Sequence, residues 1–159
     1  MALEPGDSVR AFLRRNDRFQ ACKDRTPLIL VGAGTGIWPL AGFIPANARR
    51  CPLDLFFSLR HPDGDFLYRD DLARRQAEGR LTRLSTATSR GEKPRYVQDA
   101  LRDEAEQVAE TVRKGARIMV CGGRAKAEGV SRALDDILAP AGLTPAMLNA
   151  EGRYVEDVF

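Results

Sequence analysis

The sequence predicts an α/β fold, in which five parallel strands form a doubly wound sheet with helices on both faces. The first observation is an apolar run at residues 28–31, which leads into a loop with glycine at every second position. A short apolar run bounded by glycine is typical of a strand buried on both faces. The second observation is that further apolar runs alternate with stretches of helical periodicity, which is typical of a parallel sheet. At 159 residues, the chain is long enough for one domain with its own core.

Each predicted element has a local signal. Pro39 suits the first turn of a helix, where its missing N–H removes no hydrogen bond. Apolar residues recur every three or four positions between 97 and 112, which predicts one amphipathic helix that ends before Lys114-Gly115. The strands are expected at residues 27–31, 53–59, 80–87, 116–121 and 153–159. The helices are expected at residues 37–48, 68–78, 97–112, 125–138 and 144–150.

The composition argues against several classes of function. The net charge is +3, from 25 basic and 22 acidic side chains, which is too small to predict nucleic-acid binding. Three widely spaced cysteines form no metal-ligand pattern, and their odd number favours a reducing compartment. The one histidine, His61, leaves little for metal or triad chemistry. No apolar stretch approaches the roughly 20 residues of a membrane span, and there is no signal peptide. We therefore expect a cytoplasmic location, or one at the cytoplasmic face of a membrane through further parts of a longer protein.

The loop after the first strand contains Gly32, Gly34 and Gly36. Glycine tolerates positive φ and lets backbone amides approach a ligand, and the N-terminus of the following helix attracts phosphate. The dinucleotide-binding pattern G-x-G-x-x-G is not met, because Ile37 stands where its third glycine belongs. From these residues alone, the loop is either an anion site or a tight connection.

Other polar residues follow the ends of predicted strands, where parallel sheets bind their ligands. The second strand ends in Arg60 and lacks the acid that holds the ribose of NAD. After the third strand come a hydroxyl, basic side chains and an aromatic ring, at Ser89, Arg90, Lys93, Arg95 and Tyr96. Such groups suit a ribose 2′-phosphate and its adenine. The alternatives are a solvated basic loop and, for Arg60, an ordinary surface arginine.

Cys121, Asp157 and Phe159 also have two interpretations each. Cys121 ends an apolar strand and is most simply a small buried side chain. Asp157 is by default a surface acid, and Phe159 a frayed terminus. However, Cys121 lies at a predicted strand end that faces the site, and the last six residues are too regularly patterned for a frayed end.

Taken together, the motifs resemble a known family. They are GAGTGIWPL (32–40), RHPDGDFLYRDDL (60–72), SR (89–90), YVQD (96–99), CGG (121–123) and GRYVEDVF (152–159). In this order they resemble the NADP(H)-binding half of the ferredoxin–NADP reductase family, most closely its diflavin and sulfite reductase flavoprotein type. The resemblance covers roughly residues 8–159 and implies a Rossmann-like fold. It implies an NADPH-dependent flavin oxidoreductase, in which hydride passes to an FAD on a separate domain and electrons continue to FMN, haem or another acceptor.

The resemblance implies two groups of phosphate-binding residues. The pyrophosphate is received by Gly34, Thr35 and Gly36, with help from Arg60. The 2′-phosphate is held by Ser89 and Arg90, together with Lys93 or Arg95.

The resemblance also implies roles near the reacting ring. Tyr96 stacks on the adenine, while Gln98 and the Gly122-Gly123 turn line the channel toward the nicotinamide. The carbon that gives up hydride lies beside Cys121 and Asp157. The flavin ring is covered by Phe159, which yields to the nicotinamide.

The sequence departs from the family at Trp38, where a small residue is usual, and at Lys126, where methionine is common. It has no counterpart of the family's flavin-binding half, so we expect no FAD to be held by this chain alone. Residues 1–26 are expected to be a linker and the exit strand of that half, and residues 27–159 the nucleotide-binding domain. The alternative is a nucleotide-binding sensor or regulatory module without redox turnover.

Overall fold

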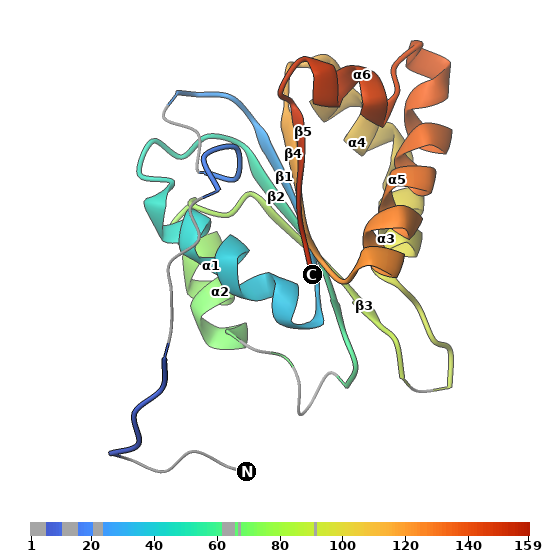
Figure 1. The fold of residues 1–159 in the computed structure, drawn as a ribbon. Helices are drawn as coiled ribbons and strands as arrows, with labels where there is room; N and C mark the ends of the chain where they lie inside the picture. The colour runs from blue at the N-terminus through green and yellow to red at the C-terminus, as the bar shows by residue number, and fades with distance from the viewer. Residues whose placement is uncertain (1–5, 11–15, 21–23, 62–65, 67, 91) are drawn as a thin grey trace.

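The computed structural model describes residues 6–10, 16–20, 24–61, 66, 68–90 and 92–159. A sheet of five parallel strands runs through its centre in the order β3-β2-β1-β4-β5 (Figure 1). The strands are β1 (Leu28–Ala33), β2 (Leu53–Leu59), β3 (Arg83–Thr88), β4 (Arg117–Gly122) and β5 (Tyr154–Val158). The predicted doubly wound, Rossmann-like α/β fold is confirmed.

Helices cover both faces of the sheet, with α1 and α2 on one side and α3 to α6 on the other (Figure 1). They are α1 (Ile37–Ala46), α2 (Arg69–Ala77), α3 (Val97–Asp103), α4 (Ala105–Arg113), α5 (Arg124–Leu138) and α6 (Pro145–Ala150). Short 3-10 turns precede α1 at Gly34–Gly36 (η1) and follow α5 at Ala139–Ala141 (η2). Within the described part of the chain, no helix has the length and apolar character needed to cross a bilayer.

Strand pairing explains why two strand ends differ from the sequence prediction. β1 extends to Ala33, two residues beyond its predicted end, because Gly32 and Ala33 pair with the last part of β2. β3 begins at Arg83 rather than at residue 80, because its first pair joins Arg83 to Asp54. Both ends therefore depend on the neighbouring strand and not on the local apolar pattern.

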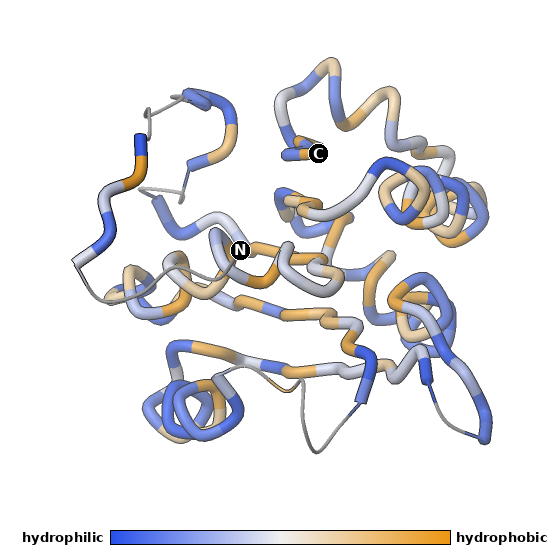
Figure 2. The backbone as a smooth tube through the Cα atoms, turned by 60° about the horizontal axis from the view of Figure 1, so that its bottom comes forward, coloured by the Kyte–Doolittle hydropathy of each residue, from blue (hydrophilic) through white to orange (hydrophobic). Residues whose placement is uncertain are grey.

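The core has two halves, one on each face of the sheet. Along β2, Leu55 and Phe57 pack with the cluster under α1 and α2, whereas Phe56 packs with the cluster under α3, α4 and α5. This alternation follows from the strand period of two residues. In Figure 2 the apolar strands run through the middle of the molecule, and the hydrophilic sides of the helices face outward. All seven residues of β2 are buried, as expected for a strand covered on both faces, and five of them are apolar.

The prediction of one helix over residues 97–112 is wrong at a single point. The structure contains two helices, α3 and α4, separated at Glu104, whose φ is −107° and ψ 27°. The Glu104 carboxylate accepts hydrogen bonds from Ser85 and, at 3.3 Å, from Arg83 of β3. Backbone hydrogen bonds to and from Glu104 still connect the two helices. The break therefore coincides with side-chain contacts to β3 that the periodicity does not contain.

Residues 16–20 contact the domain, whereas residues 6–10 are all exposed. Phe19 is 8% exposed, belongs to the core cluster under α1, and its ring centroid lies 5.7 Å from that of Phe43. The side chain of Arg18 donates a hydrogen bond of 3.0 Å to Asn149. Residues 6–10 and 16–20 contain no strand, and 11–15 lie outside the described residues. The exit strand thus stays a prediction.

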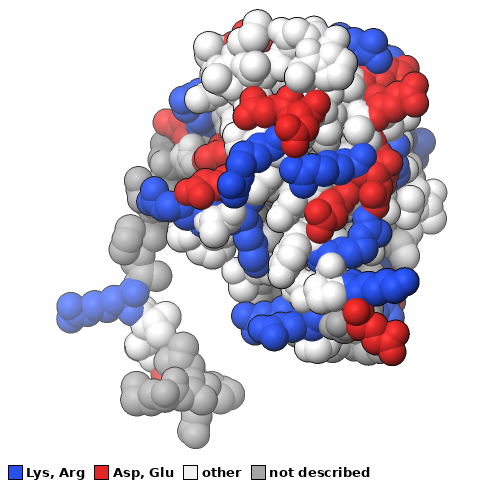
Figure 3. Space-filling view, turned by 90° about the vertical axis from the view of Figure 1, so that its right-hand side faces the viewer, with Lys and Arg blue, Asp and Glu red and all other residues white. Residues whose placement is uncertain are grey.

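The face formed by α3, α4 and α5 carries acidic and basic side chains in a mixed arrangement (Figure 3). Arg102 of α3, for example, pairs with Asp136 of α5 at 3.3 Å and with Asp99 at 3.9 Å. Such exposed pairs contribute little to stability. Their interspersion balances the charge of this face locally.

Asp54 of β2 is a buried carboxylate, and its burial makes the stability of the fold depend on pH. Asp54 is 5% exposed and pairs with Arg83 at 3.0 Å. Burial raises the pKa of Asp54 above its ordinary value of 3.8, although the nearby Arg83 opposes the shift. The folded state therefore binds this proton more tightly than the unfolded state, so the contribution of Asp54 to stability falls as pH rises through 3.8 toward the shifted pKa.

We expect Asp54→Asn to gain stability relative to the parent as pH rises from about 4 to 7. Urea unfolding at several pH values measures this difference. Asp24→Asn is the control, because hydrogen bonds from Thr26 lower the pKa of Asp24, so its pH trend has the opposite sign. The same trend for both variants would contradict the role of burial at Asp54.

Candidate nucleotide-binding site

A cleft of about 480 Å³ opens at the carboxyl ends of the strands. It lies where β1 and β4 are neighbours and the chain leaves β1 toward one face of the sheet and β4 toward the other (Figure 1). Ligands of doubly wound sheets bind at this switch point. The cleft is lined by Ala33, Gly34, Thr35, Phe57, Ser58, Leu59, Arg60, Ser89, Gly123, Lys126 and Phe159. Residues at or just after the ends of all five strands therefore contribute to one cavity.

The glycine turn is shaped by two different requirements. Gly34 has a φ of +58°, in the left-handed region that glycine adopts without strain. Gly36 is buried, and a Cβ there would lie 2.1 Å from the carbonyl oxygen of Cys121 in β4. Ile37, which replaces the third glycine of the dinucleotide pattern, is fully buried in the core. The close approach of helix to sheet is thus made by Gly36, and the position after it is free to carry a core side chain.

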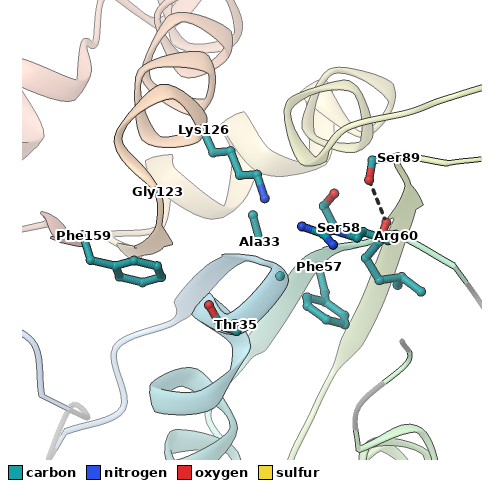
Figure 4. A pocket seen from close by; sticks show the side chains of 11 residues that line it. Ala33, Thr35, Phe57, Ser58, Arg60, Ser89, Gly123, Lys126 and Phe159 are labelled. Atoms are coloured by element: carbon teal, nitrogen blue, oxygen red, sulfur yellow. Dashed lines mark hydrogen bonds between the residues drawn. The ribbon is translucent and has the colours of Figure 1, made fainter. Parts of the chain in front are cut away.

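Ser89 is fixed on the opposite side of the cleft by the end of β2. Its backbone N–H donates to the carbonyl oxygen of Leu59 at 2.9 Å, and its hydroxyl donates to the same oxygen at 3.2 Å. The backbone N–H of Arg90 donates to the carbonyl of Arg60 at 3.1 Å. Ser89 and Arg60 therefore lie on one wall, while Lys126 and Phe159 approach from the other side (Figure 4). The walls carry hydroxyl, guanidinium, ammonium and aromatic groups.

The rest of the basic loop lies outside the lining of the cleft. Arg90, Lys93, Arg95 and Tyr96 are all exposed. The guanidinium of Arg95 pairs with Asp103 of α3, and the backbone N–H of Tyr96 donates to Asp99 at 2.8 Å. Lys93, by contrast, forms no ion pair with another residue of the described chain. The structure therefore separates the two cations that the sequence leaves as alternatives.

Cys121 and Asp157 are paired in register at the ends of β4 and β5 but do not line the cleft. Cys121 is 2% exposed and packs in the core cluster under α1. Burial, and secondarily the charge of Asp157, raise the pKa of the Cys121 thiol to about 11. This thiol is neutral at physiological pH. Phe159 is 72% exposed, lines the cleft, and donates its backbone N–H to Gly122 at 3.3 Å.

The side chain of Gln98 lies outside the lining of the cleft. Its side chain packs against Gly129 of α5, where a Cβ would lie 3.3 Å from the Gln98 amide nitrogen. It therefore contributes to the contact between α3 and α5 and does not line the cleft. In the Gly122-Gly123 turn, Gly122 is buried at the end of β4, and Gly123 lines the cavity.

Sequence reasoning assigned no role to several lining residues. Ala33 and residues 57–59 belong to strand ends whose side-chain character is not distinctive. Lys126 is different, because a charged residue two positions into the helix after Gly122-Gly123 is a signal that the sequence does contain. Among the described residues, no group of three His, Cys, Asp or Glu side chains is arranged to hold a metal ion.

Comparison with known proteins decides the family. The oxidoreductase NAD-binding domain family matches residues 30–132. The chain belongs to this family. The matched region begins in β1 and ends within α5, so it contains the glycine turn, Arg60, Ser89 and Gly123 of the cleft.

This oxidoreductase NAD-binding domain is also similar to curated proteins named sulfite reductase [NADPH] flavoprotein alpha-component. The identity is 36% over 99% of this chain for the protein of Neisseria meningitidis serogroup A, and 36% over 99% for that of Photorhabdus laumondii. For the protein of Thiocapsa roseopersicina it is 40% over 90% of this chain. The chain spans 28% of the length of each of these relatives. The resemblance in the motifs is thus confirmed.

Proposed function

We propose that this domain binds NADPH in the cleft and presents its hydride to an FAD held by a separate domain. The observation that carries the proposal is the gathering of the glycine turn, Arg60, Ser89, Gly123 and Phe159 in one cavity at the switch point. The relatives are NADPH flavoproteins by name, and this chain corresponds to a part of them. The FAD domain would supply the electron acceptor, and residues 1–26 would connect to it. Electrons would then continue to FMN, haem or another acceptor.

The pyrophosphate is assigned to the glycine turn. The left-handed Gly34 leaves the backbone of the turn without a Cβ that would obstruct a ligand, and the exposed Thr35 follows it before the beginning of α1. Gly36 serves this turn indirectly, by letting it approach β4. Arg60 reaches the same cavity from β2 and supplies positive charge.

The 2′-phosphate is assigned to Ser89 and Arg90, with Lys93 as the second cation. Arg95 is already paired with Asp103, whereas Lys93 has no such partner among the described residues. Tyr96 is 47% exposed beside this loop, so its ring is accessible to stack on the adenine. A serine hydroxyl, a forked guanidinium and an ammonium group together suit a phosphate dianion.

The nicotinamide end is assigned to the turn after β4 and to the end of β5. Gly123 and Phe159 line the cavity together, and the exposed ring of Phe159 must move aside when the nicotinamide enters. Asp157 stabilises the positive charge that develops on the ring as hydride leaves, and Cys121 supports that end of the sheet from the core. Hydride loss converts NADPH into NADP⁺, and the acceptor gains both electrons.

The test of the function has two parts. Calorimetric titration of the chain with NADP⁺ and NAD⁺ measures nucleotide binding and preference, and we expect the phosphorylated nucleotide to bind more tightly. Addition of a flavin domain from a relative tests turnover, measured as NADPH-dependent reduction of ferricyanide. Binding without any turnover would favour a sensor or regulatory module, and absence of binding would contradict both interpretations.

The chemical step separates the residues at the nicotinamide end. In the chain joined to a flavin domain, Asp157→Ala should slow flavin reduction while leaving the Kd for NADP⁺ nearly unchanged, because the charge it stabilises exists only as hydride leaves. Cys121→Ala should act in the same direction, with some loss of stability because the thiol is part of the core. Phe159→Ser should instead tighten nucleotide binding and relax the preference for NADPH, since no ring then has to be displaced.

Stopped-flow flavin reduction, combined with titration of NADP⁺, measures both effects. The control is Asp70→Ala, an exposed acid of α2 that does not line the cleft. If the Asp157 and Cys121 variants reduce flavin at the parent rate, neither residue takes part in the chemical step. Asp157 is then an ordinary surface acid, and Cys121 is only a small side chain of the core.

A further inference from the structure

Lys126 is a cation of the cleft to which neither the family match nor the motifs assign a role. It lies in the first turn of α5, a helix of 15 residues, and it lines the cavity. Its Nζ is 3.7 Å from the point where a Cβ would lie on Gly34, so the ammonium group is beside the glycine turn. Figure 4 shows the side chain reaching from α5 into the space between Phe159 and Ser58.

The surroundings of this ammonium group favour an anionic ligand. Among the described residues, the charged side chains that line the cleft are Arg60 and Lys126, and no carboxylate lines it. Lys126 is exposed and lines the cavity, and it forms no ion pair with another described residue. The ammonium group therefore lies beside a glycine turn that leads into a helix, and a cation next to a helix N-terminus suits phosphate oxygens.

We propose that Lys126 binds the pyrophosphate of the dinucleotide directly, opposite the glycine turn. The proposal rests on the proposed function. A methionine, which is common in the family at this position, has no charge with which to bind phosphate. The position favours the pyrophosphate over the 2′-phosphate, because Ser89, assigned to the 2′-phosphate, is held across the cleft by the end of β2. The pyrophosphate is common to NAD and NADP, whereas the 2′-phosphate belongs to NADP alone. Lys126 thus sets affinity for both nucleotides without setting the choice between them.

The experiment uses this difference. Lys126→Met removes the charge and keeps a long, helix-compatible side chain. We expect its affinities for NADP⁺ and NAD⁺ to fall by the same factor, about tenfold, with the ratio between them unchanged. The binding of NADP⁺ should also become less dependent on salt, because one charge contact is lost. Lys126→Arg, which keeps the positive charge, should bind both nucleotides with most of the parent's affinity.

Arg124→Met is the matched control, because Arg124 is an exposed cation of the same helix turn that does not line the cleft. It should bind both nucleotides as the parent does, and thermal melting of both variants checks that α5 is intact. A loss confined to NADP⁺ would place Lys126 at the 2′-phosphate and overturn the proposal. Unchanged affinities in Lys126→Met would overturn it as well, while the proposed function would stand. If the parent binds neither nucleotide, both the function and this inference fail.

Discussion

In the double variant Ser89→Ala/Arg90→Ala, the ratio of the affinity for NADP⁺ to that for NAD⁺ should fall by about a hundredfold. Each hydrogen bond to a charged phosphate contributes about 1.5–3 kcal/mol, and the variant removes one from the hydroxyl and at least one from the guanidinium. A loss of about 3 kcal/mol corresponds to roughly a hundredfold in affinity. The affinity for NAD⁺, which lacks the 2′-phosphate, should stay close to that of the parent.

Calorimetric titration of both nucleotides measures the two affinities. Arg95→Ala is the matched control, since the guanidinium of Arg95 pairs with Asp103 and should contribute little to binding. Lys93→Ala should weaken NADP⁺ binding more than Arg95→Ala does. If the double variant keeps the parent's preference, the basic loop after β3 is only a solvated surface.

Gly36→Ala should destabilise the domain by about 3 kcal/mol or more, which is at the upper end of the cost of overpacking. The new Cβ would lie 2.1 Å from the Cys121 carbonyl oxygen and 3.1 Å from the Gly122 backbone nitrogen. Both atoms belong to β4, so the conflict cannot be relieved by a side-chain rotation. The turn has to move away from the sheet, and the midpoint of thermal unfolding should fall by about 6–12 °C for a domain of this size.

The same displacement should weaken NADP⁺ binding, because the amides of the turn leave the position that the pyrophosphate requires. Gly42→Ala is the control on the same helix, since nothing lies within 4 Å of its Cβ position. In a helix interior this change should stabilise by about 0.5–1 kcal/mol. Differential scanning calorimetry measures both variants. Equal stability of Gly36→Ala and the parent would contradict the close approach of η1 to β4.

The sequence by itself determined the sheet, the order of its elements along the chain, and the edge at which the cleft lies. The reason is that period-two and period-3.6 patterns record burial, and the carboxyl ends of parallel strands lie at one edge of a sheet. Gly34, Arg60 and Ser89 all follow strands, so their convergence could be predicted from the order of elements alone. The roles of single residues in nucleotide binding came from the resemblance and are still predictions.

Only the tertiary structure decided which partners individual side chains have. Glu104 interrupts the predicted helix beside contacts to Ser85 and Arg83, which lie about twenty positions earlier in the chain. Gln98 packs against Gly129, and Lys126 reaches the glycine turn from a helix on the other side of the sheet. Such contacts join residues far apart in sequence, and local periodicity records whether a residue is buried but not what it meets. The sequence could therefore predict where the cleft lies, whereas the fold decides which charges enter it.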